Sequence, residues 1–185
     1  MNAWFVICVV ALAGLWATGV YNGLIQLRLR ADGAWSDIDV QLKRRYDLIP
    51  NLVETVKGYA AHEQTVFIRV TQARSQAMQA ATPKDKEAAE GALTGALKSL
   101  FAVAENYPQL RANENFMGLQ QSLSQVEETL QNARRYYNAV VRDYNTKLTV
   151  IPDRFVAQIG GFQSKPFFQL GSAEEAIAPK VSFNQ

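Results

Sequence analysis

The first 27 residues of this 185-residue chain lack charged side chains altogether. All 19 Lys and Arg and all 17 Asp and Glu occur from Arg28 onward, so the average charged share of 19% describes neither part of the chain. Cysteine and histidine occur once each, as Cys8 and His62. A single cysteine excludes a disulfide-stabilised miniprotein, and the ordinary charge of the second part excludes acidic disorder. The composition indicates an uncharged segment joined to one globular domain.

The same scarcity leaves few ways to build a catalytic or metal site. A zinc site needs several Cys or His ligands, and Cys8 lies in the apolar segment. His62 precedes Glu63, but residue 66 is valine, so the two-histidine pattern of zinc proteases is absent. Neither phosphate-loop pattern, GxxxxGK[ST] or GxGxxG, occurs. We therefore predict a protein without catalytic residues, cofactor, metal or small-molecule substrate, and a solvated or helix-end position for His62.

Only three polar side chains interrupt the segment from Ala3 to Leu27, which is otherwise apolar or small. As a helix its 25 residues extend about 37 Å, more than the roughly 30 Å of a hydrocarbon core. A cleaved signal peptide is the alternative, but no Lys or Arg precedes the run, which is longer than a typical signal core. The sequence predicts a retained single-pass membrane helix over residues 1–27.

Residues at both ends of this helix suit the membrane–water interface. Trp4 and Tyr21 lie about 26 Å apart along a helix, and amphipathic rings favour that depth. Arg28 and Arg30 follow the helix and nothing basic precedes it. The positive-inside rule therefore favours a domain on the cytoplasmic side of the membrane, with the opposite side as the alternative.

Small residues recur four apart in the membrane helix, as Gly14 with Thr18 and Gly19 with Gly23. Such pairs let two membrane helices approach closely and associate. Small residues are also simply common in membrane helices, so the pattern alone leaves both interpretations open. On the first interpretation each of these two pairs is a candidate helix-packing site.

The charged part shows helical periodicity throughout, which predicts an all-α fold. One face continues from the membrane segment into the domain without a turn signal, and a second face spans four heptads with Asn113 as its N-cap. Its Ala and Tyr positions suit an antiparallel bundle of three to four long helices. The two faces consist of Leu24, Leu27, Ala31, Ala34, Ile38 and Leu42, and of Phe116, Leu119, Leu123, Val126, Leu130, Ala133, Tyr137, Val140 and Tyr144.

Proline and glycine mark the predicted interruptions. Pro50 is expected to kink the first helix or to start a new one, and Gly58 to end it. Residues 82–86 are expected to form a polar connection before a helix over 87–104, and Pro108 and Pro152 to limit later helices. The predicted organisation is a membrane helix at 1–27, a bundle at 28–160 that ends with a short helix before Gly160-Gly161, and an irregular tail at 161–185.

Two surface features were assigned to contacts with subunits or lipid. Lys43, Arg44 and Arg45 form a basic cluster about 23 Å beyond the membrane exit of the helix. With a net charge of only +2 and a pI near 8.7, nucleic-acid binding is not expected. The cluster is expected to pair with acids of a neighbouring helix or subunit, or with lipid headgroups. Phe167 and Phe168 in the tail are expected to dock on the bundle or on a neighbour.

Four stretches of the chain resemble the LemA family. They are YNGLIQLRLRADGAWSDIDVQLKRRYDLIPNLVETVKGYAAHE from Tyr21, AENYPQLRANENFMGLQ from Ala104, ARRYYNAVVRDYN from Ala133 and FQSKPFF from Phe162. The resemblance implies an all-helical antiparallel bundle behind one membrane helix, in a bacterial membrane protein without established catalytic residues. A relative in magnetotactic bacteria is associated with forming magnetosome membranes, and some relatives begin like lipoproteins, which would place the domain outside the cytoplasm.

Together these features predict a non-enzymatic membrane scaffold that self-associates, with membrane lipids and further copies of itself as partners. The alternative is a membrane-anchored adaptor for another membrane protein, such as a protease or a signalling component. A homo-oligomer of the full-length chain favours the scaffold. A stoichiometric partner without a homo-oligomer favours the adaptor.

Overall fold

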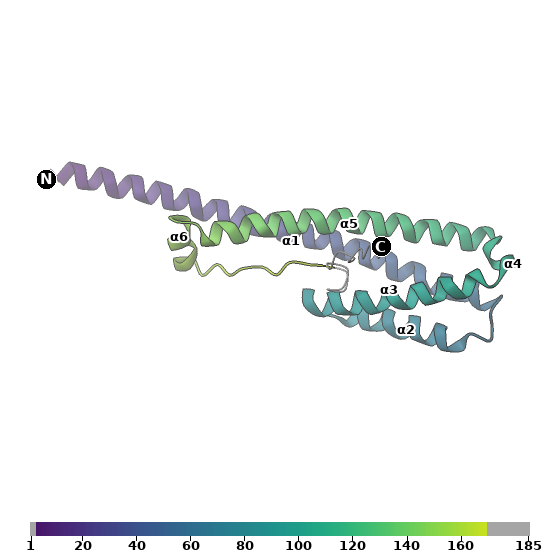
Figure 1. The fold of residues 1–185 in the computed structure, drawn as a ribbon. Coiled ribbons are helices and arrows are strands. Elements are labelled where there is room, and N and C mark those ends of the chain that lie inside the picture. Colours follow the sequence, from purple (N-terminus) through teal and green to yellow (C-terminus); the bar gives the residue numbers. More distant parts are fainter. Residues whose placement is uncertain (1–2, 170–185) are drawn as a thin grey trace, which may run out of the picture. The chain divides into compact units, whose positions relative to one another are not determined.

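The computed structural model describes residues 3–169, and every regular element in that range is a helix (Figure 1). This confirms the predicted all-α class. The part of the predicted tail at 170–185 lies outside the described residues. The elements are α1 (Ala3–Lys57), α2 (Gln64–Gln79), α3 (Pro83–Glu105), α4 (Pro108–Arg111), α5 (Glu114–Thr149) and α6 (Asp153–Ile159).

The helices form two compact units, and α1 and α5 contribute to both. The first unit contains the chain up to Val40 together with Thr129–Phe167, and the second contains Gln41–Glu128 and the chain from Phe168. The change of composition at Arg28 therefore lies inside the first unit, within one uninterrupted helix.

In the first unit, α1 and α5 run antiparallel. Lys147 of α5 lies over Gly23, and Tyr137 contacts the ring of Trp35 with centroids 5.3 Å apart. The predicted periodic positions of both helices in this unit face the interior. Each large apolar side chain buried there contributes about 1.5–3 kcal/mol to folding, so the two stripes determine how the helices pair. The residues below 9% exposure are Val20, Leu24, Ala31, Ala34, Ile38, Leu130, Tyr137, Val140, Val141, Tyr144 and Ala157.

The chain after α6 is not helical, yet it is fixed along α5. Gly160-Gly161 ends the helix as predicted, and Gly161 has a φ of +67°, a conformation that glycine adopts without a steric penalty. The hydroxyls of Tyr144 and Tyr137 donate to the backbone carbonyls of Gln163 and Pro166, at 3.0 and 2.9 Å. The side chain of Asn145 exchanges two hydrogen bonds with the backbone of Lys165, at 2.9 and 3.0 Å. We call residues 162–166 the strap.

The second unit combines the end of α1, the helices α2, α3 and α4, and the start of α5. Figure 1 shows α2 and α3 side by side as a hairpin. Gly58 follows the last residue of α1, as predicted. The backbone N–H of Phe116 donates to the side chain of Asn113 at 3.0 Å, which confirms Asn113 as the cap of α5. Phe116 also contacts the ring of Phe101 in α3.

Two local predictions need comment. Of the two alternatives for Pro50, the start of a new helix at Asn51 is excluded, because α1 continues through Pro50 to Lys57. The expected connection at 82–86 is instead the first turn of α3, because Thr82 caps the helix by accepting from the N–H of Asp85 at 3.1 Å. Pro83 then occupies the first helical position, where its missing N–H costs nothing.

Candidate functional site

The N-terminal part of α1 has almost no cover from the rest of its unit. From Ala3 to Gly19 nearly every side chain is exposed, and packing begins at Val20. Nine large apolar side chains between Trp4 and Trp16 are exposed. Among the described residues, α1 is the one helix that is long and apolar enough to cross a membrane, a property compatible with a membrane protein. This segment is the first candidate functional surface.

The residues predicted for the membrane interface differ in their surroundings. Trp4 is exposed, whereas the ring of Tyr21 meets the edge of Phe162 with centroids 5.4 Å apart. Arg28 and Arg30 are exposed on α1. Their assignment to a membrane interface stays a prediction.

The small residues of the apolar segment separate into an open and a covered group. A Cβ at Gly14 or Gly19 would meet no atom within 4 Å. Thr18 donates its hydroxyl to the carbonyl of Gly14 at 2.9 Å, so it carries no unsatisfied donor. A Cβ at Gly23 would lie 2.6 Å from Nζ of Lys147. Gly23 therefore faces its own chain, and the residues left for contact with another helix are Gly14, Thr18 and Gly19.

The three residues of the basic cluster differ in their solvent exposure. Lys43 and Arg44 are exposed, but Arg45 is only 5% exposed and lies inside the second unit. Arg45 pairs with acids of neighbouring helices of its own chain, one of the outcomes expected for the cluster, and its expected contact with lipid or another subunit is corrected. It lies three residues after Leu42 and four before Ile49, on the buried face of α1.

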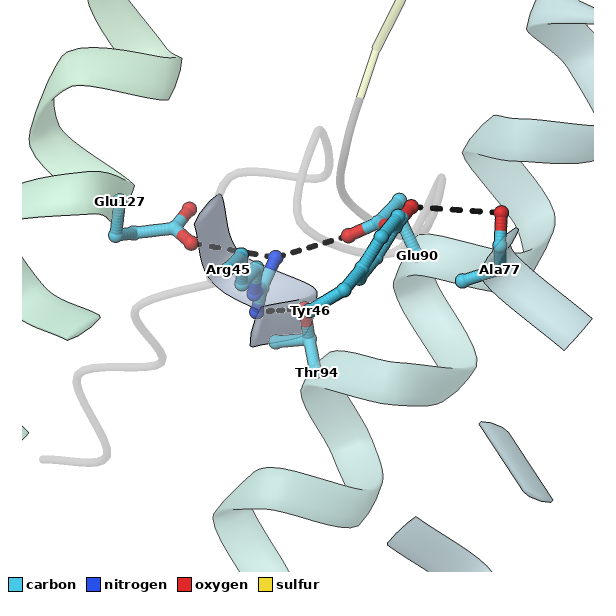
Figure 2. A network of polar contacts seen from close by, with 6 residues as sticks. All are labelled: Arg45, Tyr46, Ala77, Glu90, Thr94 and Glu127. Atoms are coloured by element: carbon cyan, nitrogen blue, oxygen red, sulfur yellow. Dashed lines mark hydrogen bonds and ion pairs between the residues drawn. The ribbon is translucent and has the colours of Figure 1, made fainter. Parts of the chain in front are cut away.

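Figure 2 shows the polar network that Arg45 enters. One terminal nitrogen of its guanidinium lies 3.0 Å from a carboxylate oxygen of Glu90 in α3 and 3.4 Å from a carboxylate oxygen of Glu127 in α5. The other donates to the hydroxyl of Thr94 at 3.0 Å. The hydroxyl of Tyr46 donates to the second oxygen of Glu90. The network joins α1, α3 and α5 inside the second unit.

The carboxyl group of Glu90 has no solvent exposure. Burial raises its pKa above the ordinary value of 4.5, against the opposing effects of the Tyr46 hydrogen bond and the Arg45 charge. Desolvation of this carboxylate therefore outweighs the attraction of its partners. A buried pair of this kind gives little net stability but strongly favours one arrangement of the helices around it.

Pro50, the proline inside α1, lies close to this network in the sequence. Proline has no N–H, so the carbonyl of Tyr46, four residues earlier, loses its helical partner. Nε of Arg74 in α2 donates to this carbonyl at 2.7 Å. A side chain from another helix thus satisfies the backbone group that Pro50 releases, and α1 continues.

Phe167 and Phe168, the two aromatic residues predicted to make contacts, also differ in solvent exposure. Phe168 has no solvent exposure, so it docks on its own chain, one of the two outcomes expected for it. Phe167 is about half exposed and remains available.

The sequence interpretation missed Glu90, Tyr46 and Arg74. A signal for Glu90 existed, because it lies three residues before Leu93 and seven before Leu97, on the apolar face of α3. The side chains of the network form hydrogen bonds with one another. His62 is exposed and is not part of the network. In the described range, no group of three or more His, Cys, Asp or Glu side chains is arranged to hold a metal ion.

Several known proteins resemble this chain along most of its length. Magnetosome protein MamQ 2 of Paramagnetospirillum magneticum is 25% identical over 91% of this chain and 72% of its own length. Magnetosome protein MamQ of Magnetospirillum gryphiswaldense is 24% identical over 87% of this chain and 70% of its own length. Protein LemA of Metamycoplasma hominis is 24% identical over 84% of this chain and 72% of its own length.

The family comparison covers most of the charged part. The LemA family model matches residues 34–183 and leaves the apolar part of α1 outside the match. The match includes both helices of the α2–α3 hairpin and all of α5 and α6. With more than half of its length matched, the chain belongs to the LemA family.

Proposed function

We propose that this LemA family protein is a non-enzymatic, single-pass protein of the bacterial inner membrane. In this proposal it self-associates through its membrane helix and organises or shapes the membrane. The observation that carries the proposal is the bare apolar stretch of α1 from Ala3 to Gly19.

The exposed apolar surface needs cover of some kind. Burying a large apolar side chain contributes about 1.5–3 kcal/mol, so lipid cover of the nine exposed ones contributes on the order of 20 kcal/mol. No Asp, Glu, Lys or Arg interrupts this surface. A bilayer therefore suits it better than water does.

The open small residues support contact between two copies of the helix. On an α-helix, Gly14 and Thr18 face about 120° away from Val20 and Leu24, which pack against the chain itself. Their surface has no side chain to hold a second helix at a distance, and close packing is the main attraction between helices in lipid. The similarity to proteins named as magnetosome proteins supports assigning the assembly to membrane organisation.

The test uses the full-length chain in mild detergent, with particle mass measured by light scattering. We expect an oligomer whose mass falls in the variants Gly14→Leu and Gly19→Leu, because a large side chain separates the helices. The matched control is Ala13→Leu, which adds the same bulk on another side of the helix. A strictly monomeric wild-type particle at high concentration would exclude the proposal. One stoichiometric partner from the native membrane, without a homo-oligomer, would favour the adaptor instead.

The side of the membrane on which the domain lies is a separate part of the proposal. Arg28 and Arg30 follow the apolar segment, and this arrangement favours the cytoplasm. A periplasmic domain would leave the self-association proposal unchanged, because that proposal depends on the apolar helix alone.

A further inference from the structure

The turn between α5 and α6 exposes an unusual amount of apolar surface. Ile151, Phe155 and Ile159 are 74%, 58% and 89% exposed. Phe155 and Ile159 lie four residues apart on α6 and share one side of it, and Ile151 lies in the turn just before this helix. Val156 and Ala157 turn inward. We call the three exposed side chains the apolar corner.

The apolar corner is fixed beside the end of the uncharged segment. Ala157 is buried in one cluster with Val20, Leu24 and Tyr144, and Val156 and Phe162 pack against that cluster. All these residues belong to the first unit. Since Val20 and Leu24 precede the first charge at Arg28, α6 lies beside a part of α1 that carries no charge.

The length of α1 places this contact at a membrane boundary. From Trp4, the residue assigned to the far interface, about 30 Å of hydrocarbon core extends 20 helical residues, to Leu24. The contact of α6 with Val20 and Leu24 therefore lies where the core gives way to headgroups. A tilted helix would move this boundary farther from Trp4 along the chain, because each residue then covers less depth.

The polar side chains nearby agree with an interfacial depth. Asn22 and Gln26 are exposed on α1 in the same turns. The amine of Lys147 lies over Gly23, and Arg154 is exposed on α6 itself. Long basic side chains that cover apolar surface while reaching headgroups are characteristic of this zone.

We propose that the apolar corner inserts into the membrane–water interface, with the lipid bilayer as its occupant. The proposal rests on the membrane insertion of α1 under the proposed function. Lipid is favoured because the buried side of α6 packs on Val20 and Leu24, directly after the exposed apolar stretch from Ala3 to Gly19. Ile151, Phe155 and Ile159 then anchor a second point of the chain about 5–10 Å deep at the acyl boundary. This contact fixes the rotation of α1 about its own axis, which a single spanning helix leaves free.

The experiment measures the depth of a fluorescent probe in reconstituted full-length protein. In a Cys8→Ser background, single variants Ile159→Cys, Leu15→Cys and Ile68→Cys carry the probe. Leu15 reports the membrane segment, and Ile68 is an exposed apolar residue of α2 in the second unit. Quenching is compared for iodide in water and for lipids with a nitroxide near the headgroup or deep in the acyl chain. Circular dichroism checks that each variant is folded.

We expect the Ile159 probe to lose its quenching by iodide and to respond most to the shallow nitroxide. The Leu15 probe should respond to the deep nitroxide, and the Ile68 probe to iodide alone. If Leu15 is quenched by lipid while Ile159 is quenched by iodide as Ile68 is, the corner proposal is overturned and the membrane helix stands. Protection of Ile159 from iodide and from both lipids would show protein cover, and would also overturn it. Iodide access to Leu15 would refute the membrane helix itself.

A second measurement separates insertion from a purely structural role. Phe155→Glu and Ile159→Glu place charge on the exposed side of α6 without touching its buried side. In detergent both variants should melt like the wild type. In vesicles a probe at position 151, introduced as Ile151→Cys, should be quenched more by iodide in these two variants than in the protein without the Glu substitutions. An unchanged lipid response at position 151 in both variants would contradict insertion of the corner.

Discussion

The carboxylate of Glu90 is fully buried beside the guanidinium of Arg45, and its burial raises the pKa of this carboxyl group despite the nearby charge. Removing one partner should therefore be far worse than removing both. We expect Glu90→Leu alone to destabilise the protein by about 3–5 kcal/mol, because the buried charge of Arg45 then keeps only the partly exposed carboxylate of Glu127, at 3.4 Å, and the hydroxyl of Thr94.

The double variant Arg45→Met with Glu90→Leu should recover most of this loss, to within about 1 kcal/mol of the wild type. Denaturant unfolding of all four forms measures the coupling. Additive effects of the two single substitutions would contradict this account of the pair.

The raised pKa of Glu90 also predicts a pH dependence. The folded state holds the proton of this carboxyl group more tightly than the unfolded state does, so it binds more protons above the ordinary value of 4.5. Stability must then fall as the pH rises from 4.5 through the folded-state pKa, and this loss is absent at lower pH.

Glu90→Gln keeps a hydrogen-bonding side chain but cannot ionise. The stability of the wild type relative to this variant should decrease across that pH window, as measured by unfolding at a series of pH values. A relative stability that increases with pH would show that the charged form is the favoured one in the folded state.

Pro50 and Arg74 provide a test of how α1 survives an internal proline. Arg74→Ala removes the donor to the carbonyl of Tyr46 and should cost about 1–2 kcal/mol. In a Pro50→Ala background the N–H at position 50 can donate to the same carbonyl, so the cost of losing Arg74 should shrink. The exposed Arg69→Ala in α2 is the control. If Arg74→Ala lowers the stability equally in both backgrounds, the role of Arg74 does not depend on Pro50.

At the scale of the elements, sequence spacing predicted the long faces well. The predicted periodic positions between Leu24 and Leu42 and between Phe116 and Tyr144 are buried or partly buried. A 3.6-residue period places these positions along one side of each helix, which faces its neighbour. The helix ends predicted near Gly58 and Gly160-Gly161 are confirmed, and at the second end Gly161 adopts a φ of +67°, which glycine tolerates. These are local properties, which the sequence carries directly.

Other features depend on contacts between residues far apart in the chain. Pro50 disrupts a helix by local rules, and the carbonyl that it leaves without a helical partner is satisfied by Arg74, 24 residues later. Arg45 belongs to a basic run by composition, but Glu90 lies 45 residues away and spacing within α1 says nothing about it. The strap is irregular, as predicted. Its hydrogen bonds to α5 do not follow a regular sequence spacing, so the sequence pattern does not reveal them.

The strap itself gives a prediction at this scale. Asn145→Ala removes both hydrogen bonds to the backbone of Lys165, and each bond contributes about 0.5–1.5 kcal/mol. We expect a loss of about 1–3 kcal/mol and faster amide hydrogen exchange in residues 162–166. Thr146→Ala, at an exposed neighbouring position of α5, is the control. Unchanged exchange in the strap would show that the tyrosine hydroxyls hold it without Asn145.

At the scale of the whole molecule, α1 connects the membrane proposal with the two units. Its exposed residues from Ala3 to Gly19 carry the apolar surface, and the same helix supplies Ile38 to the first unit and Leu42 to the second. Of the small residues considered for self-association, Gly23 is occupied by its own chain. The proposed contact between copies is therefore confined to Gly14, Thr18 and Gly19.

The central claim is that several copies of α1 associate within one membrane. It is tested most directly by electron cryo-microscopy of the full-length protein in lipid discs that keep the apolar segment embedded. We expect particles with several α1 helices side by side in lipid, in closest contact at Gly14 with Thr18 or at Gly19. Particles that hold a single α1 helix in lipid at every protein concentration would contradict it.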